Sequence, residues 1–187
     1  MKVKSIERTL IPDVLIITPE IFKDDRGYFF ESFNINDFER LGLPTKFVQD
    51  NQAFSQKGTL RGFHYQLKHP QGKLVRTVQG EVFDVAVDIR VGSPTFGRAV
   101  GTILSDTNNK IMFVPEGFAH AYLVLSKEAL FQYKCTEVYH PEDEYGIIWN
   151  DQELNIGWPI KVPVLSIKDR ELPTLKQINK RHLPRYK

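Results

Sequence analysis

The stretch GEVFDVAVDIR (residues 80–90) carries the clearest strand pattern in the chain. From Phe83 onward its large apolar residues take alternate positions, while Asp84, Asp88 and Arg90 lie between them, and only Ala86 departs from this order. Because successive side chains of a β-strand point to opposite faces, this two-residue period predicts a strand with one apolar and one polar face. We therefore expect the chain to fold mainly as β-sheet.

Segments of the same kind recur on both sides of this stretch, separated by turns rich in Gly, Pro and Asn. Regularly spaced short strands favour an all-β antiparallel barrel or jelly roll with a few short helices over alternating β and α units. One helix is expected after Asn34 or Asn36, with Phe38 and Leu41 on its apolar side and Gly42 at its end. The further strands are expected at residues 14–18, 28–33, 47–52, 74–79, 100–104, 111–114, 120–125 and 130–137.

Length and composition limit the class of protein. A chain of 187 residues, with 41% hydrophobic and 26% charged residues, fits one globular domain over residues 1–187 with a peripheral, solvated basic tail at 171–187. The net charge of +2 is too small to indicate nucleic-acid binding, and the apolar runs are far too short to span a bilayer. A single cysteine, Cys135, excludes an intramolecular disulfide framework, and no secretory signal is evident. We therefore expect a cytoplasmic protein with no nucleic-acid or membrane partner.

The stretch LRGFHYQ (residues 60–66) places an arginine and a histidine close together in a strand-like segment. In a regular strand Arg61 and His64 point to opposite faces, because they lie three residues apart. A bulge at Gly62 would reset the alternation and let both side chains face one site. The sequence is compatible with either arrangement.

The stretch PEGFAH (residues 115–120) places a histidine at the start of a later strand and is similar to the second motif of the cupin fold. The first cupin motif normally supplies a His-x-His pair and a later glutamate to a metal, whereas the matching stretch here reads His64-Tyr65-Gln66. Metal sites need several converging nitrogen or oxygen ligands. Because His64 and His120 alone are too few ligands for such a site, we expect no metal and no cofactor.

Several other polar residues have ordinary structural explanations when each is taken by itself. Lys73 at a strand start and Asp169 in a Lys-Asp-Arg run are typical of solvated surface, and Tyr133 falls on an apolar strand face typical of core packing. A buried tyrosine near a histidine can nevertheless act as an acid. The guanidinium groups of Arg26 and Arg61 match the oxygens of a diphosphate. Because no GxGxxG or GxxxxGK(S/T) loop is present, side chains would have to hold a nucleotide.

Ten stretches, in a fixed order along the chain, combine these candidates into one pattern. They are DDRGYFFESFN (24–34), FVQDNQ (47–52), LRGFHYQ (60–66), QGKLVRTVQGEVFDVAVDIR (71–90), GSPTFG (92–97), VPEGFAHAYLVLS (114–126), YKCTEVYHPEDE (133–144), GIIWND (146–151), IGWP (156–159) and LSIKD (165–169). Together they resemble the dTDP-4-dehydrorhamnose 3,5-epimerases over most of the chain. The departures are Phe63 and Ala121, in place of an aliphatic residue and a glycine, and Thr77 and Gln79, in place of Val and Arg. None of them removes a polar residue expected in the site.

The resemblance implies a metal-free, homodimeric jelly roll of the cupin type that binds a dTDP-linked 4-keto-6-deoxysugar. By match to the family, His64 is the general base and Asp169 orients it, Lys73 stabilises the oxyanion, and Tyr133 returns a proton from the opposite face. Tyr139 matches the ring that stacks on thymine. The substrate-binding residues implied in the same way are Arg26, Glu31, Gln49, Asp50, Asn51, Arg61, His120, Tyr139, Glu144 and Lys168.

The reaction implied is the inversion of C3 and C5 of dTDP-4-keto-6-deoxy-D-glucose through an enolate, which gives dTDP-4-keto-L-rhamnose for dTDP-L-rhamnose biosynthesis. A narrower relative that epimerises only C3, or isomerises the ketone of another dTDP-deoxysugar, is one alternative. A non-catalytic nucleotide-sugar binding protein is another, but simple binding would not require His64, Lys73, Tyr133 and Asp169. A metal-dependent cupin oxygenase is the weakest alternative.

Overall fold

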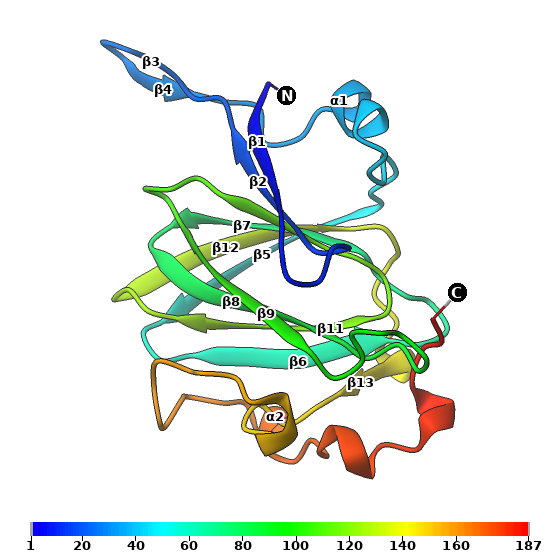
Figure 1. Cartoon of the computed structure of the whole chain (residues 1–187). Coiled ribbons are helices and arrows are strands. Elements are labelled where there is room, and N and C mark those ends of the chain that lie inside the picture. Colours follow the sequence, from blue (N-terminus) through cyan, green and yellow to red (C-terminus); the bar gives the residue numbers. More distant parts are fainter. Residues whose placement is uncertain (1, 187) are drawn as a thin grey trace.

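A computed structural model describes residues 2–186 as two facing antiparallel sheets with a separate hairpin (Figure 1). The six-stranded sheet has the strand order β1-β2-β10-β7-β12-β5, and the five-stranded sheet has the order β13-β6-β11-β8-β9. This arrangement confirms the expected all-β antiparallel fold. The strands are β1 (Val3–Arg8), β2 (Leu15–Pro19), β3 (Phe22–Asp24), β4 (Gly27–Phe29), β5 (Gln49–Gln56), β6 (Leu60–Gln66), β7 (Lys73–Gln79), β8 (Glu81–Asp88), β9 (Ala99–Ser105), β10 (Ile111–Val114), β11 (Phe118–Val124), β12 (Glu128–Cys135) and β13 (Glu144–Gly146).

The helices of the described residues are short. The expected helix is α1, which begins after Asn34, whose side chain accepts a hydrogen bond from the Asn36 N–H. Its residue Phe38 is fully buried, and the chain leaves the helix at Gly42, which has a positive φ of 68°. The helices are α1 (Ile35–Arg40) and α2 (Ile167–Arg170), together with the 3₁₀ helices η1 (Pro141–Asp143), η2 (Gln152–Leu154), η3 (Leu175–Gln177) and η4 (Lys180–His182).

Strand β8, the centre of the opening stretch, is buried on both faces. Val85 and Val87 pack on the outside of the five-stranded sheet, while Val82 and Ala86 belong to the core between the sheets. Asp84 lies on that inner face and is fully buried. The alternation in the sequence is therefore real, but its polar face points into the barrel rather than into solvent.

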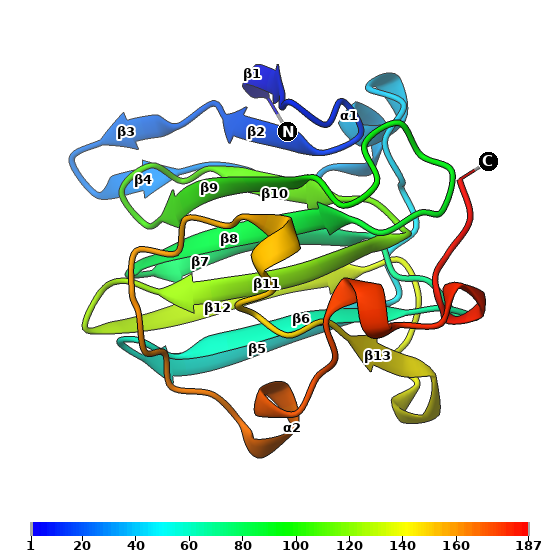
Figure 2. The same cartoon turned by 60° about the horizontal axis from the view of Figure 1, so that its bottom comes forward.

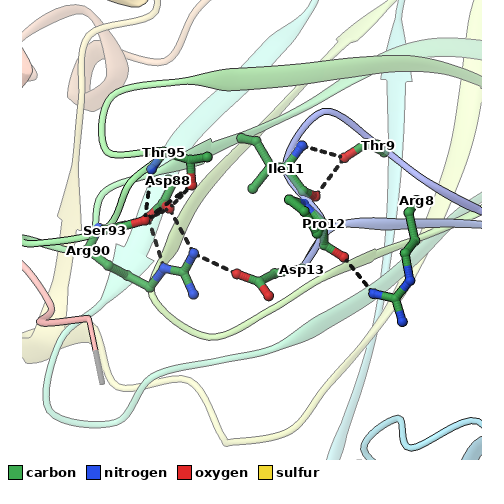
Figure 3. Close-up of polar contacts among 9 residues, drawn as sticks. All are labelled: Arg8, Thr9, Ile11, Pro12, Asp13, Asp88, Arg90, Ser93 and Thr95. Carbon is green, nitrogen blue, oxygen red and sulfur yellow. Dashed lines mark hydrogen bonds and ion pairs between the residues drawn. The ribbon is translucent and has the colours of Figure 1, made fainter.

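A buried polar network closes the end of β8 (Figure 3). The Asp88 carboxylate, which has no exposed area, accepts hydrogen bonds from Arg90, Ser93 and Thr95. Arg90 also donates to Asp13 in the loop between β1 and β2, at 2.8 Å. Burial alone would raise the pKa of Asp88, but these hydrogen bonds outweigh it and lower the pKa below its ordinary value. The network fastens two loops to the barrel.

The C-terminal part of the chain lies over the outer face of the five-stranded sheet (Figure 2). The Lys, Arg and Glu side chains of residues 171–186 are exposed, as expected for a basic segment, but Leu175 and Leu183 are buried against the sheet. The ring of Tyr186 lies 4.9 Å from the guanidinium of Arg90. The expectation of a solvated tail therefore holds only for its charged groups.

No helix among residues 2–186 is long and apolar enough to cross a membrane.

Candidate active site

A cavity of about 640 Å³ opens between the two sheets. Its walls are inward-facing side chains of β5, β7 and β12 from one sheet and of β6 and β11 from the other, and the segment around α2 closes one side. The residues predicted from the sequence that line it are Gln49, Asn51, Arg61, His64, Lys73, His120, Tyr133, Tyr139, Glu144, Lys168 and Asp169.

His64 and Asp169, 105 residues apart in the chain, share a short hydrogen bond. His64 Nε2 lies 2.6 Å from Asp169 Oδ1, and the carboxylate is buried on α2, where Ser166 caps the helix. Burial alone would raise the pKa of Asp169, but hydrogen bonds from His64, Ser166 and the Gly62 N–H, with the charge of His64, lower it below the ordinary value. An ionised carboxylate only accepts, so Nε2 carries the hydrogen and Nδ1 keeps the lone pair of the neutral ring. Nδ1 is thus the nitrogen free to take a proton.

A bulge in β6 places Arg61 and His64 on the same cavity. On the neighbouring strand β11, His120 is opposite His64 and Tyr122 is opposite Arg61, so a single intervening residue faces two residues of β6. Gly62 adopts a φ of 113°, which is the left-handed region that favours glycine. Of the two arrangements left open by the sequence, the structure has the one in which Gly62 breaks the alternation.

Tyr133 lines the same cavity as His64 but comes from the opposite sheet. It lies on β12 in the six-stranded sheet, whereas His64 lies on β6 in the five-stranded sheet, and both line the cavity. Burial raises the pKa of the Tyr133 hydroxyl to about 12, with smaller contributions from the nearby Cys135 and Tyr122. The hydroxyl is therefore protonated at neutral pH and can donate a proton.

Lys73 lies at the start of β7 on the cavity wall and is 8% exposed. Burial lowers the pKa of its ammonium group, and the charges of Cys135, Glu144 and Asp84 oppose that shift. A cation held in such a poorly solvated position interacts strongly with any negative charge that develops in the cavity.

A second histidine–carboxylate pair lies deeper in the barrel. His120 Nε2 is 2.8 Å from Asp84 Oδ1, and both side chains are buried. Asp84 Oδ2 accepts no hydrogen bond from the described residues. The His120 ring thus lies on the cavity wall, and its Nε2 is held by Asp84 of the neighbouring strand.

A polar cluster lies on the same cavity beside Asp169. Glu144 Oε2 accepts hydrogen bonds from the Tyr139 hydroxyl at 2.9 Å and from Lys168 Nζ, while Glu144 Oε1 lies 3.6 Å from His64 Nδ1. Burial alone would raise the pKa of Glu144, but the hydrogen bonds and the charges of Lys168 and His64 lower it below its ordinary value. The Tyr139 N–H donates to Gln49 Oε1 at 2.7 Å.

Three of the residues implied by the resemblance lie outside this cavity. Asp50 alternates with its neighbours in β5, so it points to the outer face of the sheet, where it pairs with Lys134 at 2.8 Å. Arg26 is at the turn of the β3–β4 hairpin, which projects from the body of the molecule (Figure 1), and Glu31 follows that hairpin. Their assignment to the substrate remains a prediction.

Sequence reasoning missed several residues that shape the cavity. Asp84 holds His120, Ser55 accepts a hydrogen bond from Arg61 Nε at 3.1 Å, and Gln66 lines the wall. The position of Asp84 on the polar face of residues 80–90 was a signal, because an acidic side chain on a central strand must point either to solvent or into the lumen of the barrel. Ser55 has no comparable signal in the sequence.

Within residues 2–186, no group of three or more His, Cys, Asp or Glu side chains is arranged to hold a metal ion. His64 and His120, which the cupin motifs single out, are each paired with an aspartate instead.

Comparison with protein families and with known proteins gives one consistent result. Residues 8–177 match the family model described as dTDP-4-dehydrorhamnose 3,5-epimerase. The enzyme of that name from Pseudomonas aeruginosa is 55% identical over 166 residues, which is 88% of this chain and 92% of the relative. The one from Escherichia coli K12 is 52% identical over 177 residues, which is 93% of this chain and 96% of the relative.

Solved structures agree with the sequence comparison. The 3,5-epimerase of Legionella pneumophila Philadelphia 1, solved with dTDP-4-keto-L-rhamnose, is 52% identical with a TM-score of 0.95, covering 98% of both chains. A 3′-monoepimerase from Streptomyces bikiniensis, solved with dTDP-quinovose, is 34% identical with a TM-score of 0.88, covering all of this chain and 93% of the other.

Proposed function

This chain belongs to the dTDP-4-dehydrorhamnose 3,5-epimerase family, and we propose that His64 is the base, Tyr133 the acid and Lys73 the oxyanion-stabilising cation of its reaction. The chain is an isomerase. It inverts C3 and C5 of dTDP-4-keto-6-deoxy-D-glucose and so forms dTDP-4-keto-L-rhamnose in dTDP-L-rhamnose biosynthesis.

One observation carries the assignment of roles: His64 and Tyr133 line one cavity from opposite sheets. His64 Nδ1 carries a lone pair because Nε2 is held by Asp169, and Tyr133 carries a proton because the ordinary tyrosine pKa of about 10 already lies well above neutral pH and burial raises the pKa of Tyr133 further. A sugar carbon between them loses a proton to one side and gains one from the other. Because the proton is removed from one face of the carbon and returned to the other, the configuration at that carbon is inverted.

Lys73 supplies the charge that the intermediate requires. The hydrogens on C3 and C5 are both α to the C4 ketone, so removal of either leaves an enolate whose negative charge falls on the former ketone oxygen. A fixed donor aimed at such an oxygen contributes about 3 kcal/mol to transition-state stabilisation. Because both enolates share this oxygen, the one buried ammonium of Lys73 serves both epimerisations.

Incubation with dTDP-4-keto-6-deoxyglucose in heavy water tests the reaction and the base together. Deuterium should enter at both C3 and C5 with the unchanged enzyme, and His64→Ala should nearly abolish entry at both carbons. Exchange at C3 alone would place the chain with the 3′-monoepimerases, and a new ketone position would indicate a ketoisomerase. Thermal stabilisation by dTDP without exchange would indicate a binding protein.

The mouth of the cavity suits a nucleotide. We assign the Tyr139 ring, 48% exposed, to stacking on thymine, and Gln49 and Asn51 to the polar edge of the base. Arg61 supplies a guanidinium group for the diphosphate, and Lys168 adds a second positive charge beside Glu144. His120 is the further sugar contact.

The β3–β4 hairpin supports a homodimer. It carries Arg26, whose side chain is 90% exposed, and exposed aromatic rings at Phe22, Tyr28 and Phe29, in a segment that projects away from its own barrel (Figure 1). Exposed rings on a projecting hairpin suit burial against a second copy of the chain. There Arg26 and Glu31 would reach the partner's cavity, which explains how residues outside their own cavity can serve the substrate.

Mixing two inactive variants tests this arrangement. In a mixed dimer of His64→Ala and Arg26→Ala chains, one cavity keeps its own histidine and receives an intact hairpin from its partner. Activity should therefore return on mixing and refolding. If each hairpin serves its own chain, no site is intact and activity stays absent.

We propose the cytoplasm as its location. A chain of 187 residues with the single cysteine Cys135 suits a reducing compartment. Fractionation of cells that produce the protein, followed by assay of the epimerase activity, checks this placement.

A further inference from the structure

Gln66 occupies the position at which a cupin metal site has its second histidine, yet its amide binds only backbone. It is the last residue of β6, it shares the inward face with His64, and it is 5% exposed on the cavity wall. Its Nε2 donates to the carbonyls of His69 at 2.6 Å and Val138 at 3.1 Å, and its Oε1 accepts from the His140 N–H at 2.8 Å. Both amide hydrogens are thus engaged, which leaves no donor for a ligand.

Two of these three hydrogen bonds flank a single residue. Val138 and His140 are the neighbours of Tyr139, and the N–H of Tyr139 itself donates to Gln49 Oε1 at 2.7 Å. Gln66 and Gln49 therefore fix the backbone on both sides of Tyr139 and at Tyr139. The ring is left half-exposed at the mouth of the cavity.

The third hydrogen bond ties the same segment to the turn after β6. Gln66 holds the His69 carbonyl, and Asp143 Oδ2 accepts from the N–H groups of Lys68 and His69, each at 2.8 Å. The rings of His69 and His140 stack with centroids 3.9 Å apart. The turn and the segment that carries Tyr139 thus form one wall, and Gln66 is the side chain that joins them from inside.

We propose that Gln66 is a positioning residue for nucleotide binding: it holds the 138–140 backbone so that the Tyr139 ring is already placed for the base before the ligand arrives. The inference rests on the proposed stacking role of Tyr139. Because a preformed platform saves the cost of ordering a loop, its loss weakens binding of the nucleotide and leaves the proton transfers at His64 and Tyr133 unchanged once the site is filled.

Gln66→Glu and Gln66→Leu test this role in two ways. Both substitutions remove the two amide donors, and Gln66→Glu also places a carboxylate against two carbonyl oxygens. We expect the dissociation constant for dTDP, measured by calorimetry, to rise roughly tenfold for each. At saturating substrate the rate of deuterium entry at C3 and C5 should stay within about twofold of the unchanged enzyme, so KM rises while kcat holds. Gln152→Glu, the same chemical change at an exposed residue outside the cavity, should alter neither constant.

The pH dependence of dTDP binding distinguishes loss of the Gln66 hydrogen bonds from a general disturbance of the fold. The carboxyl group introduced by Gln66→Glu is buried against carbonyl oxygens, so its pKa is raised, and protonation at mildly acidic pH restores one donor. The dTDP affinity of Gln66→Glu should therefore recover in part at acidic pH, whereas that of Gln66→Leu should not. The same other titratable groups lie near this wall in both variants, so their effects cancel in the ratio of the two dissociation constants; they are His69, His140, Glu142, Asp143 and Glu144.

A double-mutant cycle with Tyr139→Ala decides whether Gln66 acts through that ring. If it does, Gln66→Leu should weaken dTDP binding in the unchanged protein but add little in the Tyr139→Ala background. Additive losses would overturn the inference. If Tyr139→Ala itself leaves dTDP affinity unchanged, the stacking assignment fails instead, so the two failures are distinguishable.

Amide hydrogen exchange on the unsubstituted protein gives an independent check that does not depend on any variant folding. The His140 N–H should be protected before dTDP is added, because Gln66 Oε1 already accepts it. An unprotected amide that becomes protected only with dTDP would mean that the ligand, and not Gln66, orders the wall.

Discussion

His64 and His120 lie opposite each other on neighbouring strands, and each donates from Nε2 to an aspartate, yet the two pairs have different surroundings. The His64 side chain is 30% exposed, and its partner Asp169 comes from α2 on a distant part of the chain. The His120 side chain is 8% exposed, and its partner Asp84 comes from the adjacent strand β8.

The two pairs differ in how easily the histidine ring can exchange a proton with the cavity. His64 combines a fixed tautomer with a partly exposed ring whose Nδ1 faces the Glu144 carboxylate at 3.6 Å, and a base needs such an unblocked nitrogen to take a proton and later release it. His120 is locked inside the barrel, where a gained charge must be balanced by buried groups. We therefore propose that the same two residue types make a base at His64 and a fixed part of the cavity wall at His120, and that the different exposure of the two side chains sets this difference.

The largest expected effect separates the two histidines directly. His64→Ala should lower deuterium entry at C3 and C5 by roughly 10³-fold, because general base catalysis typically contributes on the order of 10²–10⁴. His120→Ala should cost less, since the base and acid remain, and its loss should include a higher KM. Equal losses of deuterium entry in the two variants would contradict the different roles proposed for His64 and His120. Circular dichroism and thermal melting provide the control for folding.

The next effect concerns Asp169, the aspartate that we propose orients the base. Asp169→Asn should lower kcat by roughly 100-fold, because an amide can donate to Nε2 and so turn the ring to the tautomer that carries its hydrogen on Nδ1. Binding of dTDP should change little, since the amide is close to the carboxylate in shape. A variant that loses dTDP affinity but keeps kcat would contradict the orienting role.

A smaller effect on activity is expected at the buried pair. Asp84→Asn should lower kcat by about tenfold and the free energy of unfolding by about 1–3 kcal/mol, because a buried hydrogen-bonded charge is replaced next to His120 and near Lys73. Urea unfolding and the deuterium assay measure the two quantities. The comparison predicts opposite rankings: Asp169→Asn should affect activity more, and Asp84→Asn should affect stability more.

The strand pattern and the motif order predicted the fold and most of the cavity. The alternation around Asp84, the Asn34 cap and the two histidine motifs are local features, and the structure contains all three. The hydrogen bond between His64 and Asp169 was expected only from the family resemblance, because no periodicity links residues 105 positions apart.

What the sequence left open was the direction of polar faces. The polar face of residues 80–90 points into the lumen because a second layer, formed by the C-terminal segment, covers the apolar face of β8. In the same way Asp50 falls between two cavity residues and yet faces outward, since strand alternation separates neighbours that a motif treats as one group. In the sequence Gln66 marks only the missing second histidine of the cupin motif, because its hydrogen bonds to distant backbone groups have no sequence signature.

The smallest expected effect is a pH dependence that belongs to the His64–Asp169 pair. The pKa of Asp169 is lowered in the folded protein, so unfolding restores an ordinary carboxyl group that binds protons more readily. The stabilisation from its ionised form is therefore complete above the ordinary Asp pKa of about 4 and is lost as pH falls through the lower folded value. Partial solvent screening limits it to about 1 kcal/mol or less. Because Asp169→Asn cannot ionise, the difference in unfolding free energy between it and the unchanged protein should shrink from pH 7 to pH 3. A constant difference over that range would mean that the hydrogen bond, and not the charge, supplies the contribution of Asp169 to stability.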